Sequence, residues 1–513
     1  AARSTATLKN SLYDSYIRAI KWATHRVKDH GVIAYVTNGG FIDSNTADGL
    51  RQTLADEFSH IYIYNLRGNQ RTAGEQSRRE GGKVFDAGSR ATVAITILVK
   101  NADHPGPATI HYTDIGDYLT RDDKLKTIAH AGSIQHLWAT PITPNPAGDW
   151  LNQRSNDFTG FIPIGAKDHP STGIFALYTR GLATSRDAWC YNASRRHVAT
   201  NIAGMINAYN HEVERTNVDP THQPTDDPRV INWNRGLRSD LARAKKYSLH
   251  DAALVTATYR PFTKQACYFD RAMNDMVYKL PAVFPDQRHD NIGLVVMAPR
   301  PEAAPAALMT GALPDLSYFT YTGQFFPRWT WEKVVTDDAL FMAGSGEVVD
   351  GYRRVDNITD EALRRFRASY GPAVTRDDVF FYVYGLLHST GYRQRYAADL
   401  KKMLPRIPLV HQGLDFMEAG RRLSELHLGY ESVPPYPLDG LAGGPGVDDP
   451  TAYAHFAVQK MTFGKATADQ KNAGAKTDQS TIVYNSHITL RLSLIHISEP
   501  TRRTPISYAV FCL

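Results

Sequence analysis

The chain has 513 residues, of which 42% are hydrophobic and 21% are charged, and it contains 37 Gly and 28 Pro. This composition is typical of a globular protein and excludes the disordered, collagen-like and fibrous classes. A chain of this length forms about two to four domains. The formal net charge of +6 is compatible with a nucleic-acid partner but is too small to require one.

Cysteine usage and hydropathy indicate the cellular compartment in which the protein resides. Three Cys are too few for a disulfide framework, and neither they nor the 19 His show the spacing of a metal site. The longest strongly apolar run, at 91–99, is about half as long as a membrane span requires. The first ten residues lack the apolar core of a signal peptide. We therefore expect a soluble cytoplasmic protein without a metal.

Both ends of the sequence are unusual. Residue 1 is Ala rather than Met, and a helical pattern begins near residue 8, so we expect residue 1 to lie inside a longer reading frame. Residues 491–513 resemble a translated sequencing-adapter sequence, and we expect this tail to be non-native. The alternative is a genuine tail in which Cys512 is a free thiol.

Helix and strand patterns alternate over the first 100 residues. Apolar residues at helical spacing predict amphipathic helices, and continuous apolar runs such as GVIAYVT predict buried parallel strands. The expected elements are helices over 8–28 and 44–58, the second capped by Ser44 or Asn45, and strands over 31–37, 60–66 and 91–100. This order predicts the second half of a doubly wound α/β sheet, without the first half or a Gly-rich nucleotide loop.

Two Pro/Gly-rich stretches, beginning near residue 104 and ending at residue 149, indicate domain borders. Between them we expect a polar bridge with a helix over 118–137. The longer remainder mixes short β-rich runs, such as 158–165 and 291–298, with helices over 239–247 and 377–406, and it predicts an α+β domain. The expected divisions are 1–103, 104–149, 150–430, a weakly structured extension at 431–490, and the tail at 491–513.

Several motifs resemble known families. An LY-containing helix after Leu12, the strand GVIAYV and KVFDAGSRATVAITILVK (83–100) resemble the later motifs of gamma-class amino-methylating DNA adenine methyltransferases. Longer blocks resemble the C-terminal half of Type ISP single-polypeptide restriction–modification enzymes. These blocks are NLRGNQRTAGEQSRREGGKVFDAGSR (65–90), TYRPFTKQACYFDR (258–271) and DVFFYVYGLLHSTGYRQRYAADLKKMLPRIPL (378–409).

The resemblance implies a fold and an activity. The fold would be a partial Rossmann-like methyltransferase sheet at 1–103 followed by an α+β target-recognition domain. The activity would be sequence-specific adenine-N6 methylation of double-stranded DNA with base flipping, using S-adenosylmethionine. The cofactor loop and the Asn-Pro-Pro-Tyr type motif of the family are absent from residues 1–120, so we expect them upstream. ATP and Mg²⁺ would belong to the family's nuclease and helicase parts, which this sequence lacks.

Phe85 is the candidate for stacking on the flipped base. The resembling enzymes carry an aromatic residue just before the strand that corresponds to 91–99, and stacking on an aromatic ring offsets the cost of extruding a base. The surrounding sequence DAGSR is polar, which favours this function over a core role. A core Phe at a strand entry is the alternative.

Tyr13 and Asn38 are the cofactor-binding candidates. Tyr13, with Tyr16, lies on the first expected helix and could wall the pocket, although core packing is the more frequent role at helical spacing. Asn38 follows the strand at 31–37, at the edge where α/β sheets bind ligands. A purely structural turn explains Asn38 equally well.

Two basic clusters are the candidates for DNA contact. The first lies in a Gly-rich insertion, where a merely solvated loop is the alternative. It contains Arg67, Arg71, Arg78, Arg79 and Lys83. The second, in the recognition domain, interleaves aromatic residues and is opposed along the sequence only by Asp240. It contains Asn232, Trp233, Asn234, Arg235, Arg238, Arg243, Lys245 and Lys246. Asn232, Asn234 and Arg235 are suitable base readers.

Two other functions remain open. Taken alone, the chain could be a catalytically inactive DNA-binding specificity module. It could also be a sugar- or protein-binding α+β scaffold, which would show no salt-dependent DNA binding.

Overall fold

The protein is described here by a computed structural model. It describes residues 2–4, 9–72, 74–85, 90–137, 139–300, 303–319, 321–334, 347–434, 444–446, 449–458, 461–472, 475 and 477–491. The chain divides into two compact units, Ala1–Tyr430 and Glu431–Leu513. Over the described ranges, no helix is both long and apolar enough to cross a membrane.

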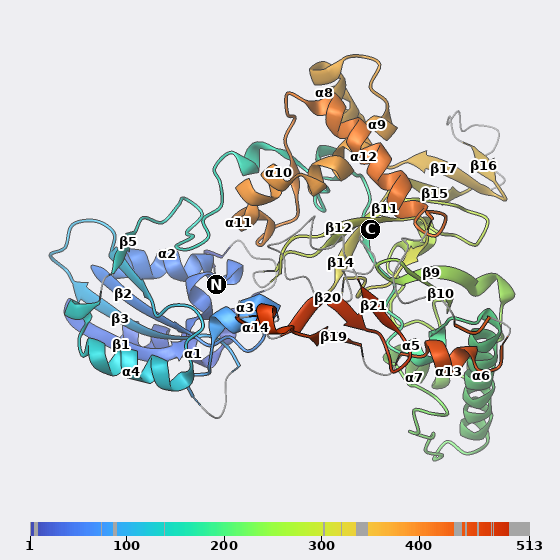
Figure 1. The fold of residues 1–513 in the computed structure, drawn as a ribbon, viewed down its shortest axis with the longest axis horizontal. Helices are drawn as coiled ribbons and strands as arrows, with labels where there is room; N and C mark the ends of the chain where they lie inside the picture. Colours follow the sequence, from blue (N-terminus) through green and yellow to red (C-terminus); the bar gives the residue numbers. More distant parts are fainter. Residues whose placement is uncertain are drawn as a thin grey trace. The chain divides into compact units, whose positions relative to one another are not determined.

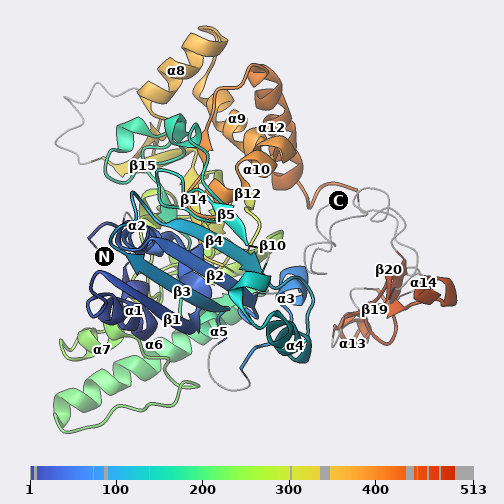
Figure 2. The ribbon, with the colours of Figure 1, turned by 90° about the vertical axis from the view of Figure 1, so that its left-hand side faces the viewer.

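The first unit begins with a five-stranded sheet in the order β1-β3-β2-β4-β5 (Figures 1 and 2). Its strands are β1 (His30–Asn38), β2 (His60–Arg67), β3 (Val93–Asn101), β4 (Thr109–Asp114) and β5 (Thr140–Ile142). β3 lies between β1 and β2 and runs antiparallel to both, whereas β2 and β4 are parallel. The strands expected at 31–37, 60–66 and 91–100 are thereby confirmed.

The expectation that residues 31–37 form a buried parallel strand is wrong. The only hydrogen-bonded neighbour of β1 within the described sheet is the antiparallel β3. Val32 and Val36 are 61% and 52% exposed. The apolar run arises because the opposite face of the strand, through Ile33, packs on the helices, while the valines line a face that these helices do not cover.

Helices α1 (Ser15–Thr24) and α2 (Asp48–Glu57) cover one face of the sheet. Ile33, Ile61 and Leu98 of the sheet share a buried cluster with Ile20 and Leu54 of these helices. Both helices are shorter than the sequence predicts. The first begins at Ser15 because Asp14 is extended, with φ −59° and ψ 143°, and the second begins after a 3-10 turn.

Residues 104–149 belong to the sheet and do not form a separate bridge. They supply β4, helix α4 (Arg121–Ala131) and β5, which pairs with β4 across Ile110 and Ile142. The helix expected within 118–137 is confirmed as α4. It begins with a capping box, in which Thr120 and Asp123 satisfy each other's backbone N–H groups.

The rest of the first unit is α+β, as expected. Its strands form the sheets β13-β9-β10-β8, β12-β11-β14-β7 and β15-β17-β16 and the ribbon β18-β6. These strands are β6 (Ile162–Pro163), β7 (Thr179–Arg180), β8 (Tyr191–Asn192), β9 (Leu254–Arg260), β10 (Thr263–Tyr268), β11 (Gly293–Met297), β12 (Ala307–Thr310), β13 (Leu313–Pro314), β14 (Gly323–Pro327), β15 (Trp329–Lys333), β16 (Val348–Val349), β17 (Tyr352–Asp356) and β18 (Arg406–Ile407).

The helices of this region differ from the expectation at one place. The helix expected over 239–247 is instead α7, because Asn234 caps it earlier. The block at 377–406 breaks at Ser389, as predicted, and Ser389 caps the next helix. The helices are α5 (Asp187–Cys190), α6 (Arg195–Val218), α7 (Arg235–Leu241), α8 (Asp360–Tyr370), α9 (Arg376–His388), α10 (Thr390–Arg395), α11 (Ala397–Leu400) and α12 (Gly413–Leu428).

A buried ion cluster joins the five-stranded sheet to the helical part of this unit. Asp149 is fully buried, and its carboxylate lies 2.8 Å from Arg154 Nε, 3.1 Å from Lys402 Nζ and 3.4 Å from Arg51 Nη2. Burial alone would raise the pKa of Asp149, but Arg154 and Lys402 lower it to about 2. The cluster therefore holds three cations from separate segments around one carboxylate.

The second unit is not the weakly structured extension that the sequence predicts. Its antiparallel sheet contains β19 (Thr462–Lys465), β20 (Thr477–Val483) and β21 (Thr489–Arg491), accompanied by α13 (Ala452–Phe456) and α14 (Ala468–Asn472). Ile482, Ile488 and Leu490 form its buried core. Arg491, which the sequence analysis assigned to the non-native tail, pairs with Thr481, while residues 492–513 lie outside the described residues.

We expect Lys402→Met to lower the free energy of unfolding of the first unit by about 3–5 kcal/mol, since it leaves fully buried Asp149 and half-buried Asp43 with one cation fewer. The control is Lys401→Met at the neighbouring, half-buried position, which should change stability by about 0.5 kcal/mol or less. Urea denaturation followed by circular dichroism measures both. Equal midpoints for the two variants would contradict the prediction.

We also expect a chain ended after Leu492 to keep the sheet of the second unit, whereas a chain ended after Asn485 loses it. The shorter chain lacks Ile488 and Leu490, two of the three buried core residues. Hydrogen exchange of β19 and β20 is the measurement. Rapid exchange in the longer chain as well would show that residues beyond 492 are needed.

Candidate nucleic-acid interface

The polar residues of the first candidate site lie where the strands of the five-stranded sheet end. β1 ends at Asn38 and β2 at Arg67, and both ends lie opposite Val93, where β3 begins. The Gly39 N–H donates to Thr92 O at 3.0 Å, and a Cβ at Gly39 would lie only 3.0 Å from the Ala94 Cβ. The chain therefore turns tightly at this edge.

Asn38 acts in that turn. Its side-chain oxygen accepts a hydrogen bond from the Gly40 N–H at 2.8 Å and caps the 3-10 turn Gly39–Ile42. The structural alternative for Asn38 is thus observed. A cofactor contact by Asn38 stays a prediction.

The two tyrosines of the first expected helix have different environments. Tyr13 is 67% exposed, so the core role that the sequence favoured for it is wrong. Tyr16 does pack as expected, with its ring centroid 6.3 Å from that of Phe41, and burial together with Asp14 raises the pKa of Tyr16 to about 12. Tyr13 could therefore contact a ligand only from the solvent-facing surface of the protein.

Phe85 is 52% exposed, and the core alternative does not hold for it. The preceding Val84 is buried with Tyr64 and Val93, which anchors the backbone beside the sheet edge. An exposed aromatic ring next to an anchored residue is suited to stacking. Stacking on a base stays a prediction, and residues 86–89 lie outside the described part of the chain.

The insertion at 67–83 is more ordered than the expected flexible loop. Residues Gly74–Glu80 form helix α3, and Gly68 N–H donates to Glu80 O at 3.1 Å. Arg67 does not face solvent as a phosphate ligand. Its Nε lies 2.6 Å from Asp114 Oδ1, and it also pairs with Asp117. Burial opposes the charge of Arg67, but these carboxylates raise its pKa.

Lys124 organises this insertion, although it is not among the residues predicted from the sequence. It is fully buried on α4, and its Nζ donates to Glu80 O at 2.7 Å and Gly82 O at 2.8 Å. Burial lowers the pKa of Lys124. The available signal was its position four residues before Ile128, on the inward face of a capped helix. Of the predicted cations, Arg71, Arg78 and Arg79 are exposed and Lys83 is half-buried.

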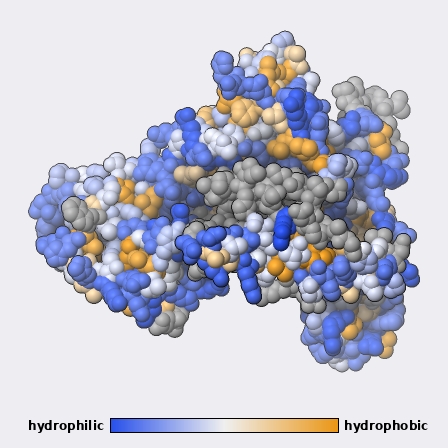
Figure 3. All heavy atoms as spheres, in the orientation of Figure 1, coloured by the Kyte–Doolittle hydropathy of each residue, from blue (hydrophilic) through white to orange (hydrophobic). Residues whose placement is uncertain are grey.

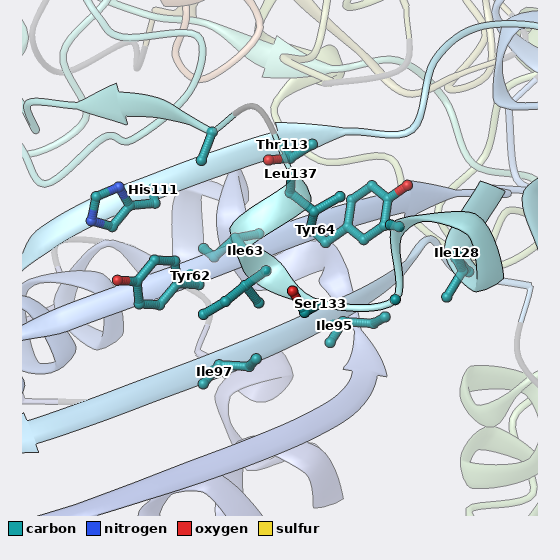
Figure 4. Close-up of a pocket in the computed structure, with 14 residues that line it drawn as sticks. Tyr62, Ile63, Tyr64, Ile95, Ile97, His111, Thr113, Ile128, Ser133 and Leu137 are labelled. Atoms are coloured by element: carbon teal, nitrogen blue, oxygen red, sulfur yellow. The ribbon is translucent and has the colours of Figure 1, made fainter.

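A small pocket lies on the sheet face that α1 and α2 do not cover (Figure 4). It has a volume of about 150 Å³ and lies beneath α4 and the turn that follows it. Tyr62, Tyr64, Ile95 and His111 contribute to its lining, and the Tyr62 and His111 rings stack with centroids 4.5 Å apart. Its apolar lining carries no cation, so it is unsuited to a phosphate.

In the second cluster, several candidate residues have structural roles. The Asn234 side chain accepts from the Leu237 N–H at 2.8 Å and caps α7. Trp233 donates from Nε1 to Thr225 O at 2.7 Å and packs against Tyr209. Asn232 is half-buried, and Arg235 is exposed without an ion-pair partner among the described residues. Figure 3 shows a largely hydrophilic surface over α6 and α7.

Acidic side chains compensate most of this cluster's charge. The expectation that only Asp240 opposes these cations is wrong, since Asp226 and Glu214 reach them from elsewhere in the chain. The ion pairs are Arg238–Asp226 at 2.8 Å, Lys246–Glu214 at 2.7 Å, Arg243–Asp240 at 3.9 Å and Lys245–Asp240 at 3.9 Å. Arg235 is therefore the strongest remaining candidate in the cluster for a phosphate or base contact.

The chain is similar to several known proteins. A family model, the Type ISP C-terminal specificity domain, matches residues 173–492. A nuclease-deletion mutant of the Type ISP restriction-modification enzyme LlaGI, in complex with a DNA substrate mimic, is 38% identical with a TM-score of 0.74, over 96% of this chain and 42% of that one.

Two further solved structures are similar. The ATP-dependent Type ISP restriction-modification enzyme LlaBIII, bound to DNA, is 33% identical with a TM-score of 0.75, over 95% of this chain and 30% of that one. A DrdV–DNA complex is 31% identical with a TM-score of 0.74, over 96% of this chain and 46% of that one. No curated protein matches the chain.

The chain is thus a mixed α/β protein that contains a C-terminal specificity domain. It belongs to the Type ISP family, as the sequence blocks predicted. It spans less than half of the length of these solved relatives. The family match continues to residue 492, so the second unit, which the sequence analysis separated as an extension, belongs largely to the specificity domain.

Proposed function

We propose that this chain recognises a specific sequence in double-stranded DNA and carries the rear half of an adenine-N6 DNA methyltransferase. In the longer polypeptide, the target adenine would be flipped out of the duplex and methylated. The observation that carries the proposal is the match of residues 173–492 to a specificity domain, together with likeness over 95–96% of the chain to Type ISP enzymes solved with DNA.

The topology of the five-stranded sheet supports the methyltransferase part. β1 and β2 run in the same direction, with the antiparallel β3 between them, and α1 and α2 cover one face. This arrangement is compatible with the rear half of a Rossmann-like sheet, because β1 forms an open edge that further strands could extend. Phe85 follows buried Val84, close to where β3 begins.

The described residues do not by themselves fit S-adenosylmethionine. The Asn38 side-chain oxygen already accepts a hydrogen bond from the Gly40 N–H, and the Tyr13 side chain is largely exposed. Among the described residues, no cluster of His, Cys, Asp and Glu could hold a metal ion. We assign the cofactor, and the ATP and Mg²⁺ of the longer enzyme, to segments other than these residues.

A catalytically inactive DNA-binding specificity module is the second candidate. It is favoured by the family match itself, which covers the specificity domain and not the sheet at 1–150. A methyl-transfer assay on this chain and on the longer polypeptide separates the two candidates.

We expect the chain to bind a mixed-sequence duplex with an affinity that falls steeply as salt concentration rises. Arg235→Gln should reduce the slope of log affinity against log salt by about 0.9 if Arg235 contacts one phosphate. Lys246→Gln is the matched control, because Lys246 is already paired with Glu214 and should change the slope less. Fluorescence anisotropy titrations measure both slopes. An unchanged slope for Arg235→Gln would remove this residue from the DNA path.

We expect Phe85→Ala, made in the longer polypeptide, to lower methylation and leave specific DNA binding nearly unchanged. Loss of stacking on the extruded adenine costs about 1–3 kcal/mol, which is about ten- to a hundredfold in rate if flipping limits turnover. Phe85→Trp should retain much of the activity, and a target adenine opposite a mismatched base should partly rescue the Ala variant. Parallel loss of binding and methylation, or aggregation, would instead identify a structural role.

A further inference from the structure

Arg186 is a buried cation without a hydrogen-bond partner. It is 2% exposed, and its Nε, Nη1 and Nη2 atoms are all unpaired. The other buried arginines among the described residues differ, because Arg51 donates to Gly148 O, Phe41 O and Ser44 O, and Arg328 pairs with Asp377 and Asp356. A buried charge without hydrogen bonds destabilises a fold. We therefore infer that Arg186 has a role other than stabilising the fold.

The backbone that carries Arg186 is strained at the surface. The preceding residue, Ser185, is exposed and has φ 53°, in the left-handed region that side chains other than glycine rarely adopt. Ser185 Oγ donates to Asp275 Oδ2 at 3.1 Å, and Ala183 pairs with Met276 in an isolated β-bridge. Strained residues of this kind concentrate at functional sites. The Arg186 side chain therefore lies directly under a surface turn.

Two other segments of the specificity domain meet this turn. The Asn234 Nδ2 lies 3.5 Å from Asp275 Oδ1, which connects the start of α7 to the same place. Asp275 and Met276 are exposed, and the exposed Arg235 follows Asn234. We call the residues Ser185, Arg186, Asn234 and Asp275 the Ser185 site. It brings together an amide, a carboxylate and a guanidinium, which are the groups that read base edges.

We propose that the Ser185 site contacts duplex DNA, and that Arg186 leaves its buried position on binding to donate hydrogen bonds to an acceptor of the duplex. This inference rests on the proposed DNA-recognition function. The acceptor is either a phosphate oxygen or the O6 and N7 edge of guanine, both of which a guanidinium binds in bidentate fashion. In the complex, the DNA accepts the hydrogen bonds that the Arg186 guanidinium does not make within the folded chain.

Arg186→Met is the decisive variant, since Met keeps most of the apolar stem and removes the charge. We expect a higher melting temperature than that of the unchanged chain, because an unpaired buried cation is lost. Burial lowers the pKa of Arg186 and outweighs the attraction of this cation to the nearby Asp275 carboxylate. We also expect duplex affinity to fall about tenfold or more. Arg196→Met, at an exposed position on α6 of the same domain, is the matched control and should change neither. Gain of stability with loss of binding is a combination that a structural arginine does not produce.

Two forms of DNA distinguish a phosphate acceptor from a guanine acceptor. On a mixed-sequence duplex, loss of a phosphate contact lowers the salt slope by about 0.9. In selection from a randomised duplex pool, loss of a guanine contact leaves the slope unchanged and removes the preference at one position. Ser185→Gly serves as the second variant. It relieves the positive φ, so we expect a higher melting temperature. It also removes the Ser185 hydroxyl from the proposed contact surface, so we expect weaker duplex binding.

These experiments distinguish failure of the Arg186 inference from failure of the proposed DNA-recognition function. If the unchanged chain shows no salt-dependent duplex binding, the proposed function fails. If the chain binds DNA and Arg186→Met binds equally well, only the present inference fails. A lower melting temperature for Arg186→Met would also overturn it, because it would show that Arg186 is paired within the folded chain, for example through a buried water.

Discussion

The buried carboxylate of Asp149 sets the geometry of the first unit. Three cations meet it: Arg154, five residues further along the chain, and, from distant parts of the sequence, Arg51 of the sheet region and Lys402 of the helical part. The Lys402 Nζ also lies 2.8 Å from Asn152 O, and the Asn45 side chain donates to Lys402 O at 3.1 Å. A cluster of this kind is sensitive to position, because each charge is tolerated only when its partners are in place. The sheet and the helical part of the specificity domain are held together through it.

The residues proposed for base flipping and those proposed for sequence recognition lie in different parts of the first unit. Phe85 and the polar strand ends lie on the five-stranded sheet, whereas Arg235 and the Ser185 site lie in the specificity domain. Base flipping requires that the target adenine be presented in register with the sequence being read. In the proposed function, the Asp149 cluster acts as the structural link between these two parts, and the second unit completes the specificity domain.

Charge is distributed differently in space than along the sequence. Arg238, Lys245 and Lys246 form a basic run in the sequence, yet each is paired with a carboxylate in the fold. Arg67 likewise pairs with Asp114 and Asp117 and stabilises the insertion from which it was expected to reach DNA. The compensating acids come from segments up to 50 residues away, as for Arg67 and Asp117, so a count of charges in a local window overestimates the basic surface.

The sequence by itself determined the family, three of the five strands of the first sheet and the break at Ser389, because these depend on local patterns and on long blocks of similarity. The tertiary structure decided the rest. The role of β1 as an exposed edge strand, the inclusion of residues 104–149 in the sheet and the order in the second unit all follow from strand pairing between distant segments. The buried positions of Lys124 and Arg186 follow from packing. A charged residue carries no local signal that its side chain turns inward, since burial depends on which neighbours the whole fold brings to it.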